Sequence, residues 1–204
     1  MGIRPDVIRA SLILELLQER DIPFTFIWSG PHYSNNLKDV FFQQLRVRAP
    51  DIELGISAES DAELVGRLVA ALAPVLERLQ PAAAVFLGDT NTVMGCLAAA
   101  QLNIPVVHIE GCMRSYDWRM PEEKYRTVVD HIADVIYAYL DEYKRQGERE
   151  GLRPEHIVVT GNPIVDVINR WFFGRREHFE TAASATFFDA RGLRRHHYYL
   201  MTCH

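Results

Sequence analysis

By its type and position, Glu110 is the residue of this chain best suited to carry out chemistry. It follows the apolar run from Pro105 to Ile109, and a carboxylate in that place should face a cleft rather than the core. Burial and a nearby Asp89 would raise its proton affinity, which suits proton transfer near neutral pH. Strand alternation would place His108 on the same side as Glu110. For His108 itself we favour a structural role, as a core histidine with satisfied hydrogen bonds.

Two further acidic segments allow a chemical and a structural interpretation. Residues 88–92, of sequence GDTNT, contain a glycine that permits close approach to a ligand, but Asp, Thr or Asn before a helix is also ordinary capping chemistry. These two interpretations have equal support. Residues 119–126 open a helix with Pro121, Glu122 and Glu123, where acidic side chains interact well with the helix dipole. Here we favour a solvated helix start.

The first residues of the chain form a segment that could bind an anion. Gly2, Arg4 and Asp6 lie at the start of a helical pattern, and Arg9 follows within the next turn. Backbone N–H groups and the helix dipole favour phosphate at such a position, and the arginines add positive charge. A capped, solvated first turn is the simpler interpretation, and the residues alone favour it.

Composition and motif content exclude several classes of protein. The 204-residue chain has 22 basic and 27 acidic side chains and a net charge of −5, which gives no electrostatic footprint for nucleic acid. No apolar stretch reaches the roughly 18 residues that a membrane span needs, and the charged first turns do not form a secretory signal. We therefore expect a cytoplasmic protein. The cysteines lack metal-ligand spacing and are expected to be buried free thiols: Cys96, Cys112 and Cys203. No metal or cofactor is predicted, and dinucleotide, P-loop and serine hydrolase motifs are absent.

Short apolar runs alternate with amphipathic stretches along residues 1–173. Helices are expected at residues 6–20, 37–45, 61–79, 93–102, 122–133, 142–150 and 163–173. Strands are expected at residues 24–28, 83–87, 105–109, 135–138 and 157–160. This order is typical of βαβ units, so we predict an α/β fold with a Rossmann-like, doubly wound parallel sheet and helices on both faces. Ligands bind beyond the carboxyl ends of such strands, where polar residues gather in this sequence.

Residues 174–204 differ in composition from the rest of the chain. They contain many Arg and His residues and few positions suited to a core. We predict a linker with a short helix, followed by a strand at residues 198–202 that opens a second domain.

Together and in this order, the motifs resemble one family, the non-hydrolysing UDP-N-acetylglucosamine 2-epimerases. The long central segment is highly specific, whereas GIRPD and GDTNT alone are not. The matching segments are GIRPD from Gly2, GDTNT from Gly88, IPVVHIEGCMRSYDWRMPEEKYR from Ile104, VDHIADVIYA from Val129, VTGNPIVDVI from Val159 and YYLMTCH from Tyr198. The resemblance spans essentially the whole chain.

The resemblance implies a fold and an activity. The fold would be the N-terminal half of a glycosyltransferase-B type structure, in which two Rossmann-like domains face a cleft. The activity would be inversion of C2 in UDP-N-acetylglucosamine to give UDP-N-acetylmannosamine, by elimination of UDP and its re-addition to a 2-acetamidoglucal. The implied partners are a UDP-sugar substrate and a second copy in a homodimer, with no nucleic acid and no membrane.

The resemblance also implies functional residues, position by position. The catalytic positions are Asp89, Glu110, Glu122 and His204. The substrate-binding positions are Arg4, Arg9 and Arg114. Three carboxylates near one site would have separated pKa values, which is a common way to obtain both an acid and a base. The residues do not decide which carboxylate is which.

The chain departs from the family pattern in ways that affect these expectations. Ile3 and Asp6 stand where the family usually has threonine and glutamate. Gly111 and Cys112 in place of alanine and glycine, and Tyr125 in place of asparagine, indicate a divergent subgroup and leave open a sugar with a further 3-acetamido or uronic acid group. Only Met1 precedes GIRPD, where the family has a strand, and most of a second domain is not represented. We therefore expect little or no activity from the chain alone.

Two alternatives to an epimerase half stay open. One is a non-catalytic remnant that oligomerises or binds a partner through exposed sheet edges. The other is half of a glycosyltransferase-B type transferase. The pair of Glu110 and Glu122 argues against the transferase, which has no need of that set.

Overall fold

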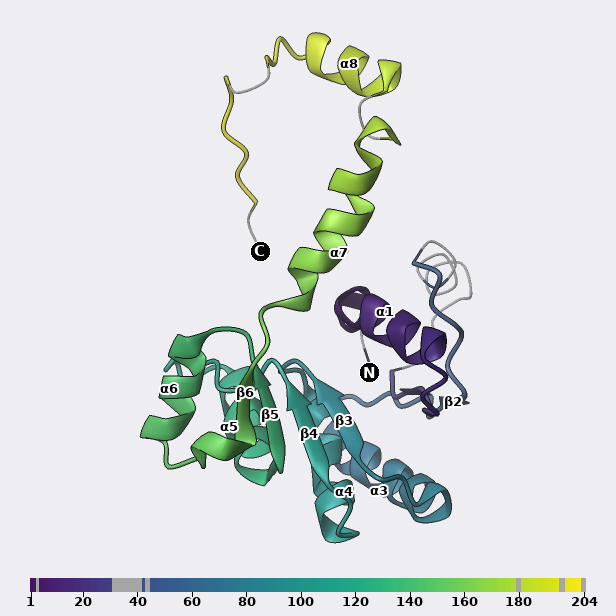
Figure 1. The fold of residues 1–204 in the computed structure, drawn as a ribbon, viewed down its shortest axis with the longest axis vertical. Coiled ribbons are helices and arrows are strands. Elements are labelled where there is room, and N and C mark those ends of the chain that lie inside the picture. Colours follow the sequence, from purple (N-terminus) through teal and green to yellow (C-terminus); the bar gives the residue numbers. More distant parts are fainter. Residues whose placement is uncertain (3, 31–41, 43–44, 179–180, 195–196, 203–204) are drawn as a thin grey trace. The chain divides into compact units, whose positions relative to one another are not determined.

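The structure is a computed structural model that describes all residues except 3, 31–41, 43–44, 179–180, 195–196 and 203–204 (Figure 1). It divides into two compact units, residues 1–164 and residues 165–204. The domain boundary that the sequence suggests after residue 173 stays a prediction. The helix predicted at residues 37–45 lies almost entirely outside the described residues.

The first unit alternates strands and helices as predicted, with one further short strand at Ile52–Glu53 that the sequence pattern did not predict (Figure 1). Its strands are β1 (Ile27–Trp28), β2 (Ile52–Glu53), β3 (Ala84–Leu87), β4 (Val106–Ile109), β5 (Val135–Ala138) and β6 (Ile157–Val159). Its helices are α1 (Arg4–Glu19), α3 (Asp61–Leu79), α4 (Cys96–Gln101), α5 (Pro121–Ile132) and α6 (Asp141–Arg149), with short 3₁₀ helices η1 (Asn91–Gly95) and η2 (Pro154–His156). The helix α7 (Pro163–Trp171) begins in this unit and continues into the next.

Four parallel strands form the main sheet, in the order β3-β4-β5-β6. Leu87 pairs with Ile109, which pairs with Tyr137, so the carboxyl ends of β3, β4 and β5 meet at one edge. The strands β1 and β2 form a separate parallel pair. Met1 lies along β1, since its amino group donates to the Ile27 carbonyl at 3.1 Å and its carbonyl accepts the Ser29 N–H at 2.9 Å.

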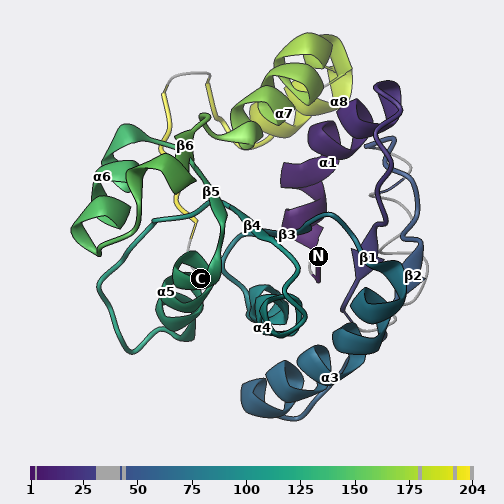
Figure 2. The same cartoon turned by 60° about the horizontal axis from the view of Figure 1, so that its bottom comes forward.

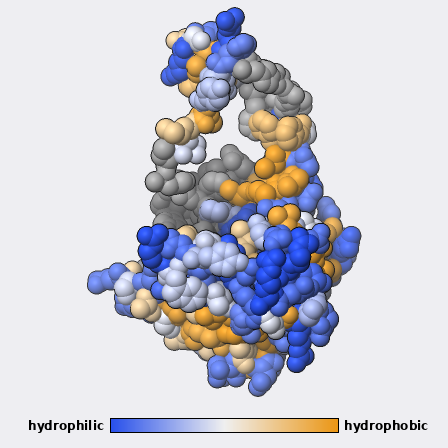
Figure 3. All heavy atoms as spheres, turned by 90° about the vertical axis from the view of Figure 1, so that its left-hand side faces the viewer, coloured by the Kyte–Doolittle hydropathy of each residue, from blue (hydrophilic) through white to orange (hydrophobic). Residues whose placement is uncertain are grey.

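Helices cover both faces of the main sheet, which confirms the predicted fold class. Figure 2 shows α4 and α5 on one side of β3 and β4 and α1 on the other. Phe86 and Val106 pack with α3 and α4 in the largest buried cluster. Leu87 and Ile109 point the other way and pack against α1, whose Val7, Ala10 and Leu14 recur at helical spacing. The outer surface of α6 is charged, and Figure 3 shows hydrophilic residues over much of that side.

The helix α3 shows why the sequence pattern predicted its bounds correctly. Ser60 accepts the Glu63 N–H and caps its start, and buried Leu68, Leu72 and Leu76 recur every four residues. Gln80 ends it in the left-handed conformation. The helix continues through Pro74, which lies inside it.

The second unit contains the predicted short helix but not the predicted strand. The helix α8 (Ala182–Asp189) is fixed by a capping box, in which the side chains of Thr181 and Ser184 each accept the other's backbone N–H. It follows the 3₁₀ helix η3 (Phe173–His178). The prediction of a strand at residues 198–202 is wrong, because these residues form neither helix nor strand. A strand needs a hydrogen-bonded neighbour, and no described segment pairs with them.

Candidate functional site at the strand ends

Arg9 connects α1 to the carboxyl ends of the main sheet. Its Nη1 forms an ion pair with Glu110 Oε2, and its Nη2 lies 3.0 Å from Asp6 Oδ1. A Cβ at Gly88 would lie 2.8 Å from Nη2, so the guanidinium lies directly against the backbone at the end of β3. Two predicted site residues, Arg9 and Glu110, are thereby brought together. The side chains are 17% and 14% exposed, so the pair is partly open to solvent.

Glu110 adopts a backbone conformation that favours glycine. Its φ is +81°, close to the +85° of Gly88 at the corresponding position after β3. A non-glycine residue in this region costs about 1–2 kcal/mol, and such strain is concentrated at functional sites. The expectation that His108 and Glu110 share a side is wrong. The Glu110 carboxylate bonds to α1 and the His108 ring bonds to α5, because the positive φ interrupts the alternation.

Asp89 binds an arginine instead of capping a helix. Its Oδ2 accepts from Arg126 Nη2 at 2.6 Å and from Arg126 Nε at 3.0 Å. The residue that caps η1 is Thr90, and its side chain makes no capping hydrogen bond. Of the two interpretations of GDTNT, the capping one is therefore not observed. We call the set of Asp6, Arg9, Glu110, Asp89 and Arg126 the strand-end cluster.

The start of α5 contains one buried and one half-buried glutamate. Glu123 is 1% exposed and accepts the N–H groups of Ser115 at 2.9 Å and Tyr116 at 2.8 Å. Burial acts to raise its pKa, but these hydrogen bonds and the one from Arg126 outweigh it and lower the pKa. The solvated helix start predicted here is wrong for Glu123, which holds the preceding loop. No hydrogen bond or ion pair joins Glu122 to Asp89 or Glu110 in the described part of the chain.

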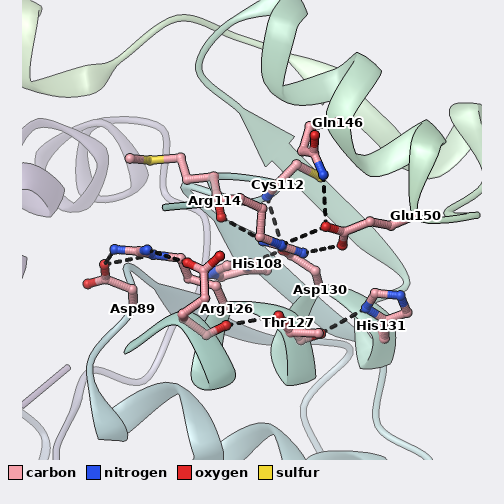
Figure 4. A network of polar contacts seen from close by, with 12 residues as sticks. Asp89, His108, Cys112, Arg114, Arg126, Thr127, Asp130, His131, Gln146 and Glu150 are labelled. Atoms are coloured by element: carbon pink, nitrogen blue, oxygen red, sulfur yellow. Dashed lines mark hydrogen bonds and ion pairs between the residues drawn. The ribbon is translucent and has the colours of Figure 1, made fainter. Parts of the chain in front are cut away.

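His108, Asp130, Arg114 and Glu150 form a second set of charges, the buried network (Figure 4). His108 is fully buried, with Nδ1 2.7 Å from Asp130 Oδ1 and Nε2 2.8 Å from the Gly88 carbonyl. A carbonyl can only accept, so Nε2 donates to Gly88, while Nδ1 lies against the Asp130 carboxylate. The structural role predicted for His108 is confirmed, since both ring nitrogens have partners.

Asp130 joins the buried network to the loop that carries Glu110. Its Oδ2 accepts the Cys112 N–H at 2.9 Å. Burial acts to raise the pKa of Asp130, but the hydrogen bonds and charges of His108 and Arg114 outweigh it and hold the pKa below its ordinary value. Through His108 the network also holds Gly88, the residue before Asp89. The buried network therefore positions both loops of the strand-end cluster.

Arg114 lies inside the buried network with its guanidinium occupied. It donates to Asp130 at 2.8 Å and to both oxygens of Glu150, at 2.6 and 2.9 Å, and its side chain is 3% exposed. These contacts are structural in the state observed. A role for Arg114 in substrate binding stays a prediction.

Several functional candidates differ from those that the sequence suggested. Arg126 and Tyr139 were not singled out, although Arg126 lies in the specific central segment, three residues after Glu123. Buried polar atoms without a described partner also gather at the strand ends: Arg9 Nε, Thr90 Oγ1 and the Tyr139 hydroxyl. Two predicted residues cannot be placed, since the side chain of Arg4 and all of His204 lie outside the described part.

Neither a metal centre nor a membrane span is found in the described residues. No group of three or more His, Cys, Asp or Glu side chains there is arranged to hold a metal ion. No helix there combines the length and apolar character needed to cross a bilayer. Cys96 and Cys112 are buried free thiols, as predicted, and Cys203 lies outside the described part.

Comparison with known proteins identifies the family. The family model for UDP-N-acetylglucosamine 2-epimerase matches residues 14–204. A UDP-N-acetylglucosamine 2-epimerase from Methanocaldococcus jannaschii is 37% identical over 167 residues, which are 81% of this chain and 46% of the relative. A UDP-2,3-diacetamido-2,3-dideoxy-D-glucuronate 2-epimerase from Pseudomonas aeruginosa is 31% identical over 183 residues, covering 86% of this chain and 50% of the relative.

A solved structure gives the same result for the fold. The Methanocaldococcus jannaschii UDP-GlcNAc 2-epimerase in complex with UDP-GlcNAc and UDP superposes with a TM-score of 0.79 at 33% identity, over 93% of this chain and 52% of that one. The chain thus spans about half the length of the relatives it matches. The expected α/β fold is confirmed, and it corresponds to about half of the solved structure. This chain belongs to the UDP-N-acetylglucosamine 2-epimerase family.

Proposed function

We propose that this chain supplies the proton-transfer half of a site that interconverts UDP-N-acetylglucosamine and UDP-N-acetylmannosamine. The observation that carries the proposal is the contact of Arg9 with Glu110 at the end of β4, beside Asp89. It places a cation suited to a diphosphate next to a carboxylate suited to proton transfer. The family match over residues 14–204 supports the reaction class.

The proposed chemistry follows from the position of the reacting carbon. The proton on C2 is not adjacent to a carbonyl, so a carboxylate must remove it while the bond from C1 to the UDP oxygen breaks. The electron pair of the C2–H bond forms the C1–C2 double bond, and UDP leaves with the pair of the C1–O bond. Re-addition of UDP at C1 and of a proton to the opposite face of C2 gives the epimer. We assign the proton transfers to Asp89, Glu110 and Glu122, and diphosphate binding to Arg4 and Arg9.

The paired state of the carboxylates suggests how substrate prepares the site. Glu110 is bound to Arg9 and Asp89 to Arg126 in the structure. A diphosphate that takes Arg9 leaves Glu110 without its cation, in a space from which the sugar excludes water. Loss of an opposite charge and loss of water both raise the proton affinity of a carboxylate. Substrate binding would thus convert a structural ion pair into a base.

A second substrate has specific support. The Pseudomonas aeruginosa relative acts, by its name, on a UDP-2,3-diacetamido-2,3-dideoxy-D-glucuronate and is 31% identical. Epimerisation at C2 would be the same reaction on that sugar. The higher identity of 37% to the Methanocaldococcus jannaschii relative favours UDP-N-acetylglucosamine.

The test uses a hybrid in which this chain replaces the 167 matched residues of the Methanocaldococcus jannaschii relative. Each UDP-sugar is incubated with the hybrid in D₂O, and proton NMR follows the stereochemistry and deuterium content of C2. We expect UDP-N-acetylmannosamine with deuterium at C2, and a rate at least about 100-fold lower for Glu110→Gln. The control is Glu142→Gln, which changes an exposed glutamate on α6.

Two results would overturn the proposal. One is a hybrid that is folded by circular dichroism and converts neither sugar. The other is equal turnover by the Glu110→Gln variant. The 204-residue chain is assayed in parallel, and robust turnover by it alone would contradict the low activity expected from the sequence.

A further inference from the structure

Tyr139 lies one residue beyond β5, at the same edge as the strand-end cluster. Ile109 pairs with Tyr137 across β4 and β5, and paired residues of parallel strands point to the same face. Ile109 packs toward α1. Tyr139 follows Tyr137 by two residues, so its side chain continues on the face that α1 covers. It thus extends toward the helix that carries Asp6 and Arg9.

The Tyr139 side chain is buried, but its hydroxyl has no hydrogen-bond partner in the described part of the chain. Only 4% of the residue is exposed. A buried hydroxyl left without a partner costs about 1–3 kcal/mol. A residue selected only for packing would be expected as phenylalanine at this place, since the ring alone fills the same volume.

The charges around Tyr139 determine what its hydroxyl can do. Burial raises the pKa of Tyr139, Arg9 opposes this, and the carboxylates of Asp6 and Asp89 add to it. The hydroxyl therefore stays protonated and is available as a donor near neutral pH. Neither Asp6 nor Asp89 accepts a hydrogen bond from it; their carboxylates bind Arg9 and Arg126.

We propose that the Tyr139 hydroxyl is a substrate-binding group that donates a hydrogen bond to a diphosphate oxygen of the sugar nucleotide, beside Arg9. This inference rests on the proposed function. Arg9 Nε is also buried without a described partner, and the Arg9 charge acts on Tyr139, so a cationic donor and a neutral donor are available in the same region. An anion with several acceptor oxygens would accept hydrogen bonds from both donors. A neutral sugar hydroxyl would do so less well.

The experiment compares the chain with its Tyr139→Phe variant. The matched control is Tyr137→Phe, which removes a hydroxyl from the same face two residues earlier, at a half-buried position. Melting temperature without ligand is measured first. We expect Tyr139→Phe to melt about 2–4 °C above the parent, because it removes an unsatisfied buried group. A fall of several degrees would show that the hydroxyl has a partner in the folded chain and would overturn the proposal.

Binding is measured next, by NMR titration with inorganic pyrophosphate and with UDP-N-acetylglucosamine. We expect Tyr139→Phe to bind each ligand about tenfold more weakly, the loss of one hydrogen bond to a charged group, and Tyr137→Phe to bind as the parent does. Unchanged binding of both ligands by Tyr139→Phe would overturn the inference and leave the proposed function intact. A loss confined to UDP-N-acetylglucosamine would overturn the assignment to the diphosphate. A parent chain that binds neither ligand would overturn the inference, whereas the proposed function is decided by the assay of the hybrid.

Discussion

The strand-end cluster and the buried network contain the same kinds of charged group, yet they differ in how completely those groups are satisfied. In the buried network, His108 uses both ring nitrogens and Arg114 donates from all three of its nitrogens. In the strand-end cluster, Arg9 Nε and two neighbouring hydroxyls lack described partners. The satisfied groups of the buried network hold the fold, and the unpartnered donors of the strand-end cluster are the groups that the proposed ligand would satisfy.

The two regions are also connected, and the geometry of the strand-end cluster depends on the buried network. The buried network holds Gly88 through His108 and Cys112 through Asp130, and these residues flank Asp89 and Glu110. Damage to the network should disturb the site, whereas changes to the site should leave the network intact.

The largest expected effect comes from breaking the buried network. Asp130→Asn removes the charge that faces His108 and Arg114, and leaving buried cations without their partner costs about 3–5 kcal/mol of stability. Urea denaturation measures the loss. The control is Asp117→Asn, which alters an exposed pair with Arg119 and should change little. Equal stability of the two variants would show that the network does not hold the fold.

The two regions should respond to pH with opposite sign. The pKa of Asp130 lies below the ordinary 3.8 for aspartate, so its contribution to stability is present above that pH and is lost as the pH falls through the lower folded value. The stability deficit of Asp130→Asn should therefore shrink in acid.

Asp6 should behave in the opposite way. Burial raises its pKa above 3.8, against the opposing Met1 amino group and Arg9. Stability linked to Asp6 is thus present below 3.8 and is lost as the pH rises through the folded value. As the pH rises through that value, the Asp6→Asn variant should become more stable relative to the parent. Denaturation curves from pH 3 to pH 7 test both signs, and parallel pH profiles for the two variants would contradict the comparison.

A smaller effect is expected from the backbone of Glu110. Glu110→Gly and Glu110→Ala both remove the carboxylate, but only glycine adopts a φ of +81° without strain. The glycine variant should be about 1 kcal/mol more stable than the alanine variant in thermal unfolding. The same pair of substitutions at Glu122, within α5, should have the opposite order, because glycine destabilises helices. Identical stability at position 110 would mean that the strain is absent.

The smallest effect concerns the thiols. Burial raises the pKa of Cys96 and of Cys112 to about 12, with the Asp130 carboxylate adding to the shift at Cys112. In a Cys203→Ser background, a thiol reagent at pH 8 should modify neither residue in the folded chain and both in urea. Modification of Cys112 in the native chain would indicate that the loop beside the buried network opens.

The sequence by itself determined the order and the bounds of most elements. Apolar periodicity and capping residues are local, so α3 was predicted residue for residue and β5 likewise. The motifs also specified the family and predicted Arg9, Asp89 and Glu110 as site residues. The strand predicted at residues 198–202 is the main difference, because strand formation depends on a neighbour that a local pattern does not contain.

Only the tertiary structure decided which of these groups meet. The pairing of Arg9 with Glu110 spans 101 residues, and that of Asp89 with Arg126 spans 37. Periodicity says nothing of contacts at that range. The positive φ of Glu110, which separates it from His108, and the burial of Glu123 beside the exposed start of α5 are also properties of the packed chain. Residue types determined what chemistry was available, and the meeting of the strand ends under α1 decided which side chains are fully hydrogen-bonded and which keep donors without a described partner.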